Sequence, residues 1–96
     1  MNILVCYDVN TLTAAGRKRL RKVARACKDF GQRVQFSVFE CTVNSTNLER
    51  LRQRLLKEVN LEEDSLRIYF LGSKREEVVE AHGRDSYVDF TEPLVL

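Results

Sequence analysis

The chain has 96 residues, of which 44% are hydrophobic and 31% charged, and these values are typical of one folded domain spanning residues 1–96. No apolar run approaches the roughly 20 residues that a membrane helix needs, and the first residues lack the basic flank and cleavage site of a secretory signal. The composition therefore argues against a membrane or secreted protein, and we expect a cytoplasmic one.

The net charge is only +2, but the two halves of the chain carry opposite charges. Residues 1–43 contain eight Lys and Arg against three Asp and Glu, a net +5, whereas residues 44–96 contain eight against eleven, a net −3. The basic half offers a surface for nucleic acid, and the acidic half limits non-specific binding or faces a basic partner.

The first predicted strand, residues 3–9, joins Ile, Leu, Val and Cys and carries the carboxylate of Asp8 near its end. A carboxylate at the end of a buried strand can hold a hard cation. The competing interpretation is that Asp8 only caps the turn that Asn10 and Thr11 predict.

A basic helix is predicted next, from Ala14 to Phe30, with Gly31 ending it in the left-handed cap conformation. Its basic residues have only one acidic neighbour within the helix, Asp29, so pairing inside the helix cannot neutralise them. A solvated surface is the plainer interpretation, but we favour contact with a phosphate backbone without base-specific recognition. The candidate residues on this helix are Arg17, Lys18, Arg19 and Arg21.

The three cysteines are odd in number and spaced 21 and 14 residues apart, which fits neither a zinc site nor a disulfide framework. Each falls in an apolar pattern, so we expect small core residues. They are Cys6, Cys27 and Cys41.

Residues 33–43 are rich in Val, Phe and Thr and should be extended, either as one bent strand or as two short strands with a bend near residues 36–38. A second helix is predicted to begin at Thr46, whose hydroxyl would cap it together with Glu49. An acidic loop at residues 62–64 leads to a strand at residues 65–71 with one fully buried face.

Residues 73–84 are charged and weakly patterned, and they predict a loop with about one helical turn near residues 76–81 that exposes His82. Residues 87–90 predict a short strand, and residues 94–96 form an apolar tail. A monomer would have to expose such a tail, so we expect the segment of about residues 85–96 to pack on a partner subunit.

The order of these elements is that of a ferredoxin-like βαββαβ sandwich with an extra C-terminal strand. In this α+β fold, two helices cover one face of the sheet and leave the other face free to pair with a second sheet. We therefore expect one domain that forms a homodimer.

The chain resembles the Cas-two family of small CRISPR-associated adaptation nucleases, and it looks closest to the members of type I-C systems. The resemblance covers essentially the whole length. Tyr7 and Asp8 after a first strand are a weak signal, whereas the string Arg-Val-Gln-x-Ser-Val-Phe-Glu at residues 33–40 is a strong one. Residues 18–24 and 64–69 also fit.

The resemblance implies a homodimer in which the two Asp8 side chains face each other across the two-fold axis and bind a divalent metal, Mg²⁺ or another cation such as Mn²⁺. It implies that Asp8 is the catalytic residue of a metal-dependent endonuclease for single-stranded RNA or double-stranded DNA. It further implies a role in spacer acquisition with the CRISPR integrase. Arg33, Ser37 and Phe39 match the family string, and Tyr7 precedes the aspartate as the resemblance implies. Arg33 would be a nucleic-acid contact, and the other three would be supporting residues.

A second function class stays open, a non-catalytic scaffold that bridges integrase subunits and binds duplex DNA along its basic helices. A general RNA-binding module is disfavoured, because the aromatic-rich Lys/Arg-Gly-Phe motif of such sheets is absent from the sequence. One carboxylate per chain cannot build a Mg²⁺ site, since the ion needs about six oxygens, but two symmetry-related Asp8 groups could anchor it.

Overall fold

The computed structural model describes residues 1–84 and residue 87. The described elements follow in the order β1 (Asn2–Asp8), α1 (Ala14–Phe30), β2 (Gly31–Gln35), β3 (Val38–Thr42), α2 (Ser45–Glu58), β4 (Ser65–Phe70) and α3 (Arg75–Val78). Within these residues, no helix has the length and apolar character needed to cross a membrane. The predicted strand at 87–90, apart from Tyr87, and the tail at 94–96 lie outside the described residues.

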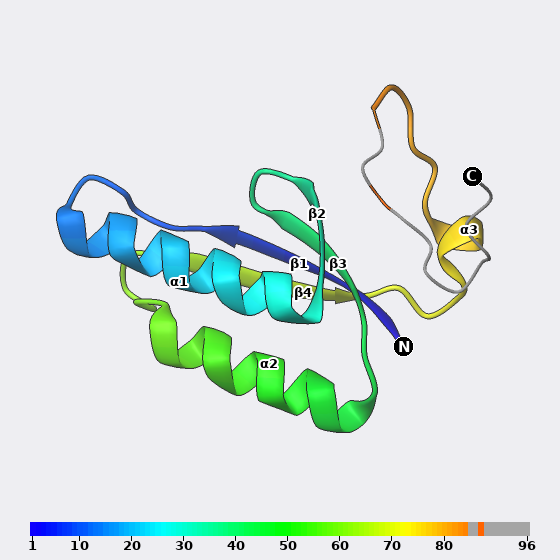
Figure 1. Cartoon of the computed structure of the whole chain (residues 1–96), viewed down its shortest axis with the longest axis horizontal. Coiled ribbons are helices and arrows are strands. Elements are labelled where there is room, and N and C mark those ends of the chain that lie inside the picture. Colours follow the sequence, from blue (N-terminus) through cyan, green and yellow to red (C-terminus); the bar gives the residue numbers. More distant parts are fainter. Residues whose placement is uncertain (85–86, 88–96) are drawn as a thin grey trace.

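The four strands form one antiparallel sheet in the order β2-β3-β1-β4. The helices α1 and α2 lie side by side on one face of this sheet (Figure 1). This arrangement confirms the predicted α+β, ferredoxin-like βαββαβ fold. The opposite face of the sheet is not covered by α1 or α2, and we call it the open face.

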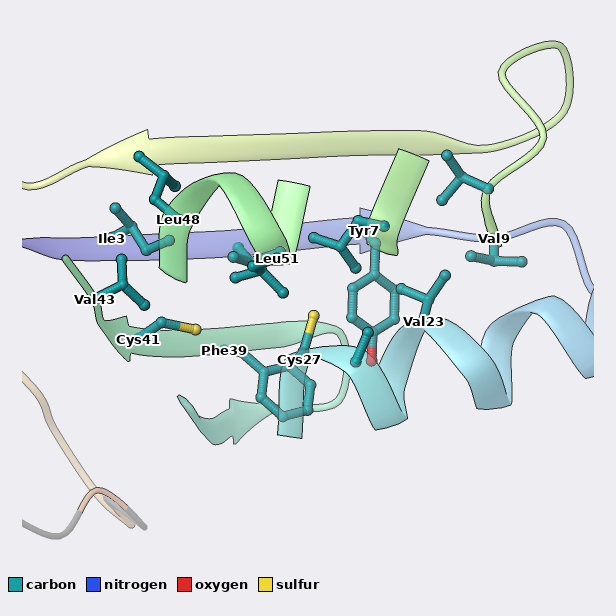
Figure 2. Packing of buried hydrophobic residues seen from close by; sticks show 14 residues of the cluster. Ile3, Tyr7, Val9, Val23, Cys27, Phe39, Cys41, Val43, Leu48 and Leu51 are labelled. Carbon is teal, nitrogen blue, oxygen red and sulfur yellow. The ribbon is translucent and has the colours of Figure 1, made fainter. Parts of the chain in front are cut away.

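The core lies between the sheet and the two helices (Figure 2). Alternate residues of β1 point into it, namely Ile3, Val5 and Tyr7, and each is at most 5% exposed. Strand periodicity places the intervening residues on the open face. The helices contribute the remaining buried side chains at helical spacing, chiefly Val23, Cys27, Leu51 and Leu55.

Residues 33–43 form a hairpin rather than one bent strand, which decides between the two alternatives. A two-residue turn at Phe36 and Ser37 joins β2 to β3. The Phe36 side chain is 94% exposed at the tip, whereas Phe39 is completely buried. Phe39 is therefore a core residue, and Phe36 is not.

The prediction of a left-handed cap at Gly31 was wrong. Its φ is −162°, which is extended backbone, and Gly31 begins β2 directly after α1 ends. Glycine is required there by a close approach instead, because a Cβ atom would collide with the Cys41 sulfur and the Glu40 carbonyl oxygen of β3.

The predicted cap of the second helix was also displaced. The cap is Asn44, whose side chain accepts a hydrogen bond from the Asn47 backbone N–H at 2.8 Å. Thr46 lies inside the first turn, and Glu49 pairs with Arg52 instead of reaching back. Asn at the cap position satisfies a free N–H of the first turn as well as Thr would, so local chemistry permitted either start.

The strand β4 has no fully buried face, contrary to the prediction. Leu66 and Ile68 are half-buried, and Phe70 is 58% exposed. The reason is position, because β4 lies at an edge of the sheet and has β1 as its neighbour.

The cysteine prediction is confirmed for Cys27 and Cys41, which are buried free thiols. Burial raises the pKa of Cys27 to about 12 and that of Cys41 to about 11, so both remain protonated and unreactive at neutral pH. Cys6 is half-buried on the open face. His82 is exposed, as expected, and contacts Glu80.

Candidate metal and nucleic-acid site

Asp8 ends β1 on the open face, with its side chain exposed. Its register partner across the β1–β4 ladder is Ser65, and this is the last pair of that ladder. On the other side of β1, the register with β3 ends earlier, at the pair Cys6 and Val38, followed by one hydrogen bond from the Tyr7 N–H to the Ser37 carbonyl. The backbone at Asp8 is thus held chiefly from β4.

No group of three or more His, Cys, Asp or Glu side chains that could hold a metal ion occurs within residues 1–84 and 87. Asp8 offers one carboxylate, and Mg²⁺ needs about six oxygen ligands, several of which can be waters. The donor set of a single chain therefore fits half of a site. An exposed carboxylate on an open sheet face is, however, accessible to an equivalent group from a second chain.

Tyr7, Phe39 and Arg33 lie behind Asp8, on the helix side of the sheet. Tyr7 is buried and stacks on Phe39 with ring centroids 6.2 Å apart, and its hydroxyl lies 3.5 Å from the Phe36 carbonyl oxygen. The Arg33 guanidinium lies over the Phe39 ring, 5.2 Å from its centroid. Burial raises the pKa of the Tyr7 hydroxyl, so it stays protonated.

These contacts give the string residues a structural task. Tyr7 and Phe39 pack beneath the site, and Ser37 accepts the Tyr7 N–H through its carbonyl oxygen. The Arg33 side chain is exposed above this packing, where an anion in solution can approach its outer side.

The predicted basic helix residues divide into two groups. Arg17, Lys18 and Arg21 are exposed, and Arg17 donates to the Thr11 carbonyl oxygen at 3.2 Å. Arg19 differs, because its side chain is 16% exposed and points toward the loop before β4.

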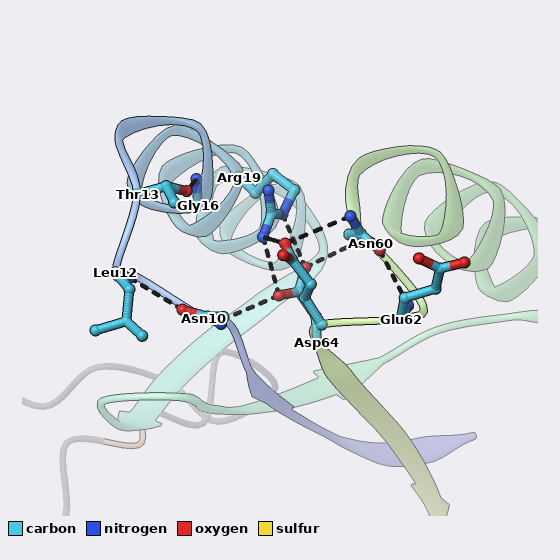
Figure 3. Close-up of polar contacts among 9 residues, drawn as sticks. Asn10, Leu12, Thr13, Gly16, Arg19, Asn60, Glu62 and Asp64 are labelled. Carbon is cyan, nitrogen blue, oxygen red and sulfur yellow. Dashed lines mark hydrogen bonds and ion pairs between the residues drawn. The ribbon is translucent and has the colours of Figure 1, made fainter.

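Arg19 donates to both oxygens of Asp64, at 2.9 and 3.3 Å, and also to Glu63 at 3.0 Å (Figure 3). The Asp64 side chain is completely buried and also accepts from the backbone N–H groups of Asn10 and Asn60. Hydrogen bonds from Arg19 hold the pKa of the Asp64 carboxyl below its usual value, and the same contacts raise the pKa of Arg19. The Arg19 guanidinium is therefore already engaged in ion pairs within the protein.

Sequence reasoning missed Asp64, which it treated as part of an exit loop. The available signal was weak, since Asp64 is simply the last acidic residue before a strand. Two of its three partners, Arg19 and Asn10, lie 45 and 54 positions away in the sequence, beyond the reach of any local pattern.

In the folded protein, the positive charge of the sequence is concentrated in the layer formed by the two long helices. The helix α1 contains seven Lys and Arg against one acidic residue, and α2 contains four against two, so the helical layer carries a net +8. The whole chain carries +2. The outer face of the helices is thus strongly positive and the remainder of the chain is acidic.

The family model of CRISPR associated protein Cas2 matches residues 1–79. The chain belongs to this family. It is 54% identical over 96 residues to the CRISPR-associated endoribonuclease Cas2 1 of Moorella thermoacetica and 51% identical over 96 residues to the CRISPR-associated endoribonuclease Cas2 of Chlorobaculum tepidum, with full coverage of both chains in each case. It is 50% identical to the CRISPR-associated endonuclease Cas2 of Halalkalibacterium halodurans over 99% of each chain.

Solved structures of similar proteins have the same fold. The crystal structure of Streptococcus pyogenes Cas2 at pH 6.5 matches with a TM-score of 0.77 and 51% identity, over 86% of this chain and 100% of that one. A hypothetical protein from Thermus thermophilus, TT1823, matches with a TM-score of 0.74 and 35% identity, over 90% of this chain and 94% of that one. The resemblance to the Cas2 family inferred from the sequence is therefore confirmed.

Proposed function

We propose that this Cas2 protein is a homodimeric, metal-dependent endonuclease that hydrolyses phosphodiester bonds in single-stranded RNA or double-stranded DNA. Relatives that match the full chain are named endoribonuclease, and another is named endonuclease. The observation that carries the proposal for this chain is the place of Asp8. It is an exposed carboxylate at the end of a buried strand, on the face of the sheet that α1 and α2 leave open.

The open face supports the homodimer. Leu4, Cys6 and Val38 are only half-buried there, and Tyr69 is 44% exposed. A second sheet packed on this face would bury these side chains and would bring two Asp8 carboxylates toward one axis, because a two-fold interface uses the same surface of both chains. The pair would then complete the half-site.

Two Asp8 groups would hold Mg²⁺ or Mn²⁺, and a bound divalent ion supplies a more acidic water and positive charge at the scissile phosphate. The residues of the chain would do the rest. Arg33, exposed at the hairpin, would pair with a neighbouring phosphate, and the exposed residues Arg17, Lys18 and Arg21 would hold the backbone of the nucleic acid along α1. Because Arg19 is occupied by Asp64, we do not include it among these contacts.

The test is cleavage of labelled single-stranded RNA and double-stranded DNA, with and without Mg²⁺, by the wild type and by Asp8→Ala and Asp8→Asn. We expect both variants to lose activity by about 100-fold or more, since residues that merely support a metal ligand already contribute about 10–100-fold. Sedimentation must first show that all three proteins are dimers. Cleavage that survives both substitutions would overturn the proposal.

The +8 charge of the helical layer favours a second candidate, a scaffold that binds duplex DNA and joins copies of the CRISPR integrase during spacer acquisition. This role needs no turnover. It predicts that Asp8→Ala still supports spacer acquisition in cells, whereas charge reversal at Arg17 and Lys18 abolishes it. If Asp8→Ala abolishes spacer acquisition while the dimer stays intact, a purely non-catalytic scaffold is excluded.

A further inference from the structure

We propose that Arg19 and Asp64 are a positioning pair: they fix the end of β1 and thereby set the place of the Asp8 carboxylate. The inference rests on the proposed function, because it assigns the pair a task in the metal site at Asp8. It gives Arg19 a role inside the protein in place of the nucleic-acid contact that the sequence predicts.

The first step is the position of the pair relative to Asp8. Asp64 immediately precedes Ser65, the register partner of Asp8, and the Asp64 carboxylate accepts the N–H of Asn10, which lies two residues after Asp8. One buried side chain therefore joins the exit of β1 to the entrance of β4. It does so directly beyond the last pair of the ladder.

The second step is that the Asp64 carboxylate is fully engaged. One oxygen accepts from Asn10 at 3.0 Å, the other accepts from the Asn60 N–H at 2.8 Å, and the Arg19 guanidinium bonds both oxygens (Figure 3). The side chain is completely shielded from solvent. Contacts between a charged acceptor and several donors are strong and directional, so this joint is stiff.

The third step concerns the loop between β1 and α1, which is also fixed at the end where α1 begins. Asn10 accepts the Leu12 N–H through its side chain at 3.0 Å, and Thr13 caps α1 by accepting the Gly16 N–H at 3.0 Å. A Cβ atom on Gly16 would collide with the Asn10 carbonyl oxygen, so the first turn of α1 lies directly against Asn10. The loop of residues 9–13 between β1 and α1 has little freedom to move while the pair is intact.

The fourth step is that Asp8 has no comparable support of its own among the described residues. Its side chain is exposed, and its backbone is held at the last pair of one ladder. The terminal pair of a strand frays most easily unless something beyond it is fixed. The contacts of Arg19 and Asp64 supply that fixed point, as residues that orient a ligand do in metal sites.

The test uses Arg19→Lys, which keeps the charge and loses the planar fork, and Asp64→Asn, which keeps the shape and loses the charge. The control is Arg54→Lys, which changes an Arg–Asp pair between α1 and α2 with a 2.8 Å contact to Asp29, on the exposed surface. Two readouts are needed besides cleavage: Mn²⁺ binding to the dimer, followed by electron paramagnetic resonance, and amide hydrogen exchange near Asp8 and Ser65.

We expect Arg19→Lys and Asp64→Asn to weaken Mn²⁺ binding by about 10-fold or more and to accelerate exchange near Asp8 and Ser65 while the β2–β3 hairpin keeps its protection. Arg54→Lys should change neither quantity. A lower melting temperature with faster exchange throughout the protein and unchanged Mn²⁺ affinity would overturn the positioning role and leave a purely structural pair.

An Asp8→Ala protein measured in parallel separates this inference from the proposed function. If Asp8→Ala does not weaken Mn²⁺ binding, the metal site itself is wrong and the positioning role falls with it. If Asp8→Ala abolishes binding while Arg19→Lys and Asp64→Asn bind as the wild type does, the metal site stands and the positioning pair is refuted.

Discussion

Asp8 pairs with Ser65 across the β1–β4 ladder, and Asp64 is the residue before Ser65, so the two carboxylates belong to one end of the sheet. Their surroundings are opposite. Asp64 is completely buried and accepts hydrogen bonds from Arg19, Asn10 and Asn60, whereas Asp8 is exposed on the open face. A carboxylate whose oxygens are already occupied stabilises the protein, and one left exposed at the end of a rigid strand is available to a ligand.

The largest expected effect separates the two carboxylates by stability. Asp64→Ala leaves the Arg19 charge and two backbone N–H groups without their acceptor, and removing one member of a buried pair is strongly destabilising. We expect the melting temperature in differential scanning calorimetry to fall by roughly 10 °C or more. Asp8→Ala should melt within about 3 °C of the wild type, and a similar fall in both variants would erase the contrast.

Acid should act through Asp64. Its pKa is lowered in the folded state, so its stabilising contribution is fully present above the unfolded value, about 3.9, and is lost as the pH falls through the lower folded value. We expect Asp64→Asn to be less stable than the wild type at pH 7, with the difference narrowing below about pH 4. Urea titrations at a series of pH values measure this, and a difference that stays constant down to pH 2 would contradict it.

A moderate effect should distinguish the exposed arginines of α1 from Arg19. Arg21→Glu should weaken binding of duplex DNA several-fold and lower the slope of log affinity against log salt, by about 0.9 for each phosphate that the protein no longer neutralises. Arg21→Lys keeps the charge and serves as the control, with binding close to that of the wild type. Fluorescence anisotropy at several salt concentrations gives both quantities, and equal slopes for the two variants would remove α1 from the interface.

Of the two Arg–Asp pairs, the one on the surface should have the smaller effect. Arg54 contacts Asp29 at 2.8 Å, but both side chains are about half exposed. Exposed pairs contribute little to stability, so Arg54→Ala should shift the melting temperature by no more than about 4 °C. A fall as large as that of Asp64→Ala would show that burial is not what separates the two pairs.

The order of strands and helices could be predicted because it depends on local periodicity. The helix from Ala14 to Phe30 has the predicted bounds, and Asp8 follows from the apolar run that precedes it. The sequence did not decide between a bent strand and a hairpin at residues 33–43, because Ser37 was the single turn-prone residue there. The turn between the two strands forms because β2 pairs with β3 in space.

The roles of the basic residues were harder to predict, for a physical reason. A periodic pattern shows that Arg19 and Arg21 lie on one helix, but not which of them faces an acidic residue 45 positions later. The same limit applies to Gly31, where a side chain would collide with Cys41 on the next strand. Long-range contacts of this kind follow from the fold and not from the local sequence.

The direct passage from α1 into β2 at Gly31 has a consequence for how the chain tolerates change in length. Since no residue separates the helix from the strand, a single inserted residue could not be absorbed in a loop. It would shift β2 by one position against β3 and exchange the two faces of the strand. Arg33 would then move to the position of Val34, and Gln32 would take its place over the Phe39 ring. The junction therefore fixes the register of the hairpin, and natural insertions in such chains should be found in the loops before α1 or before β4 instead.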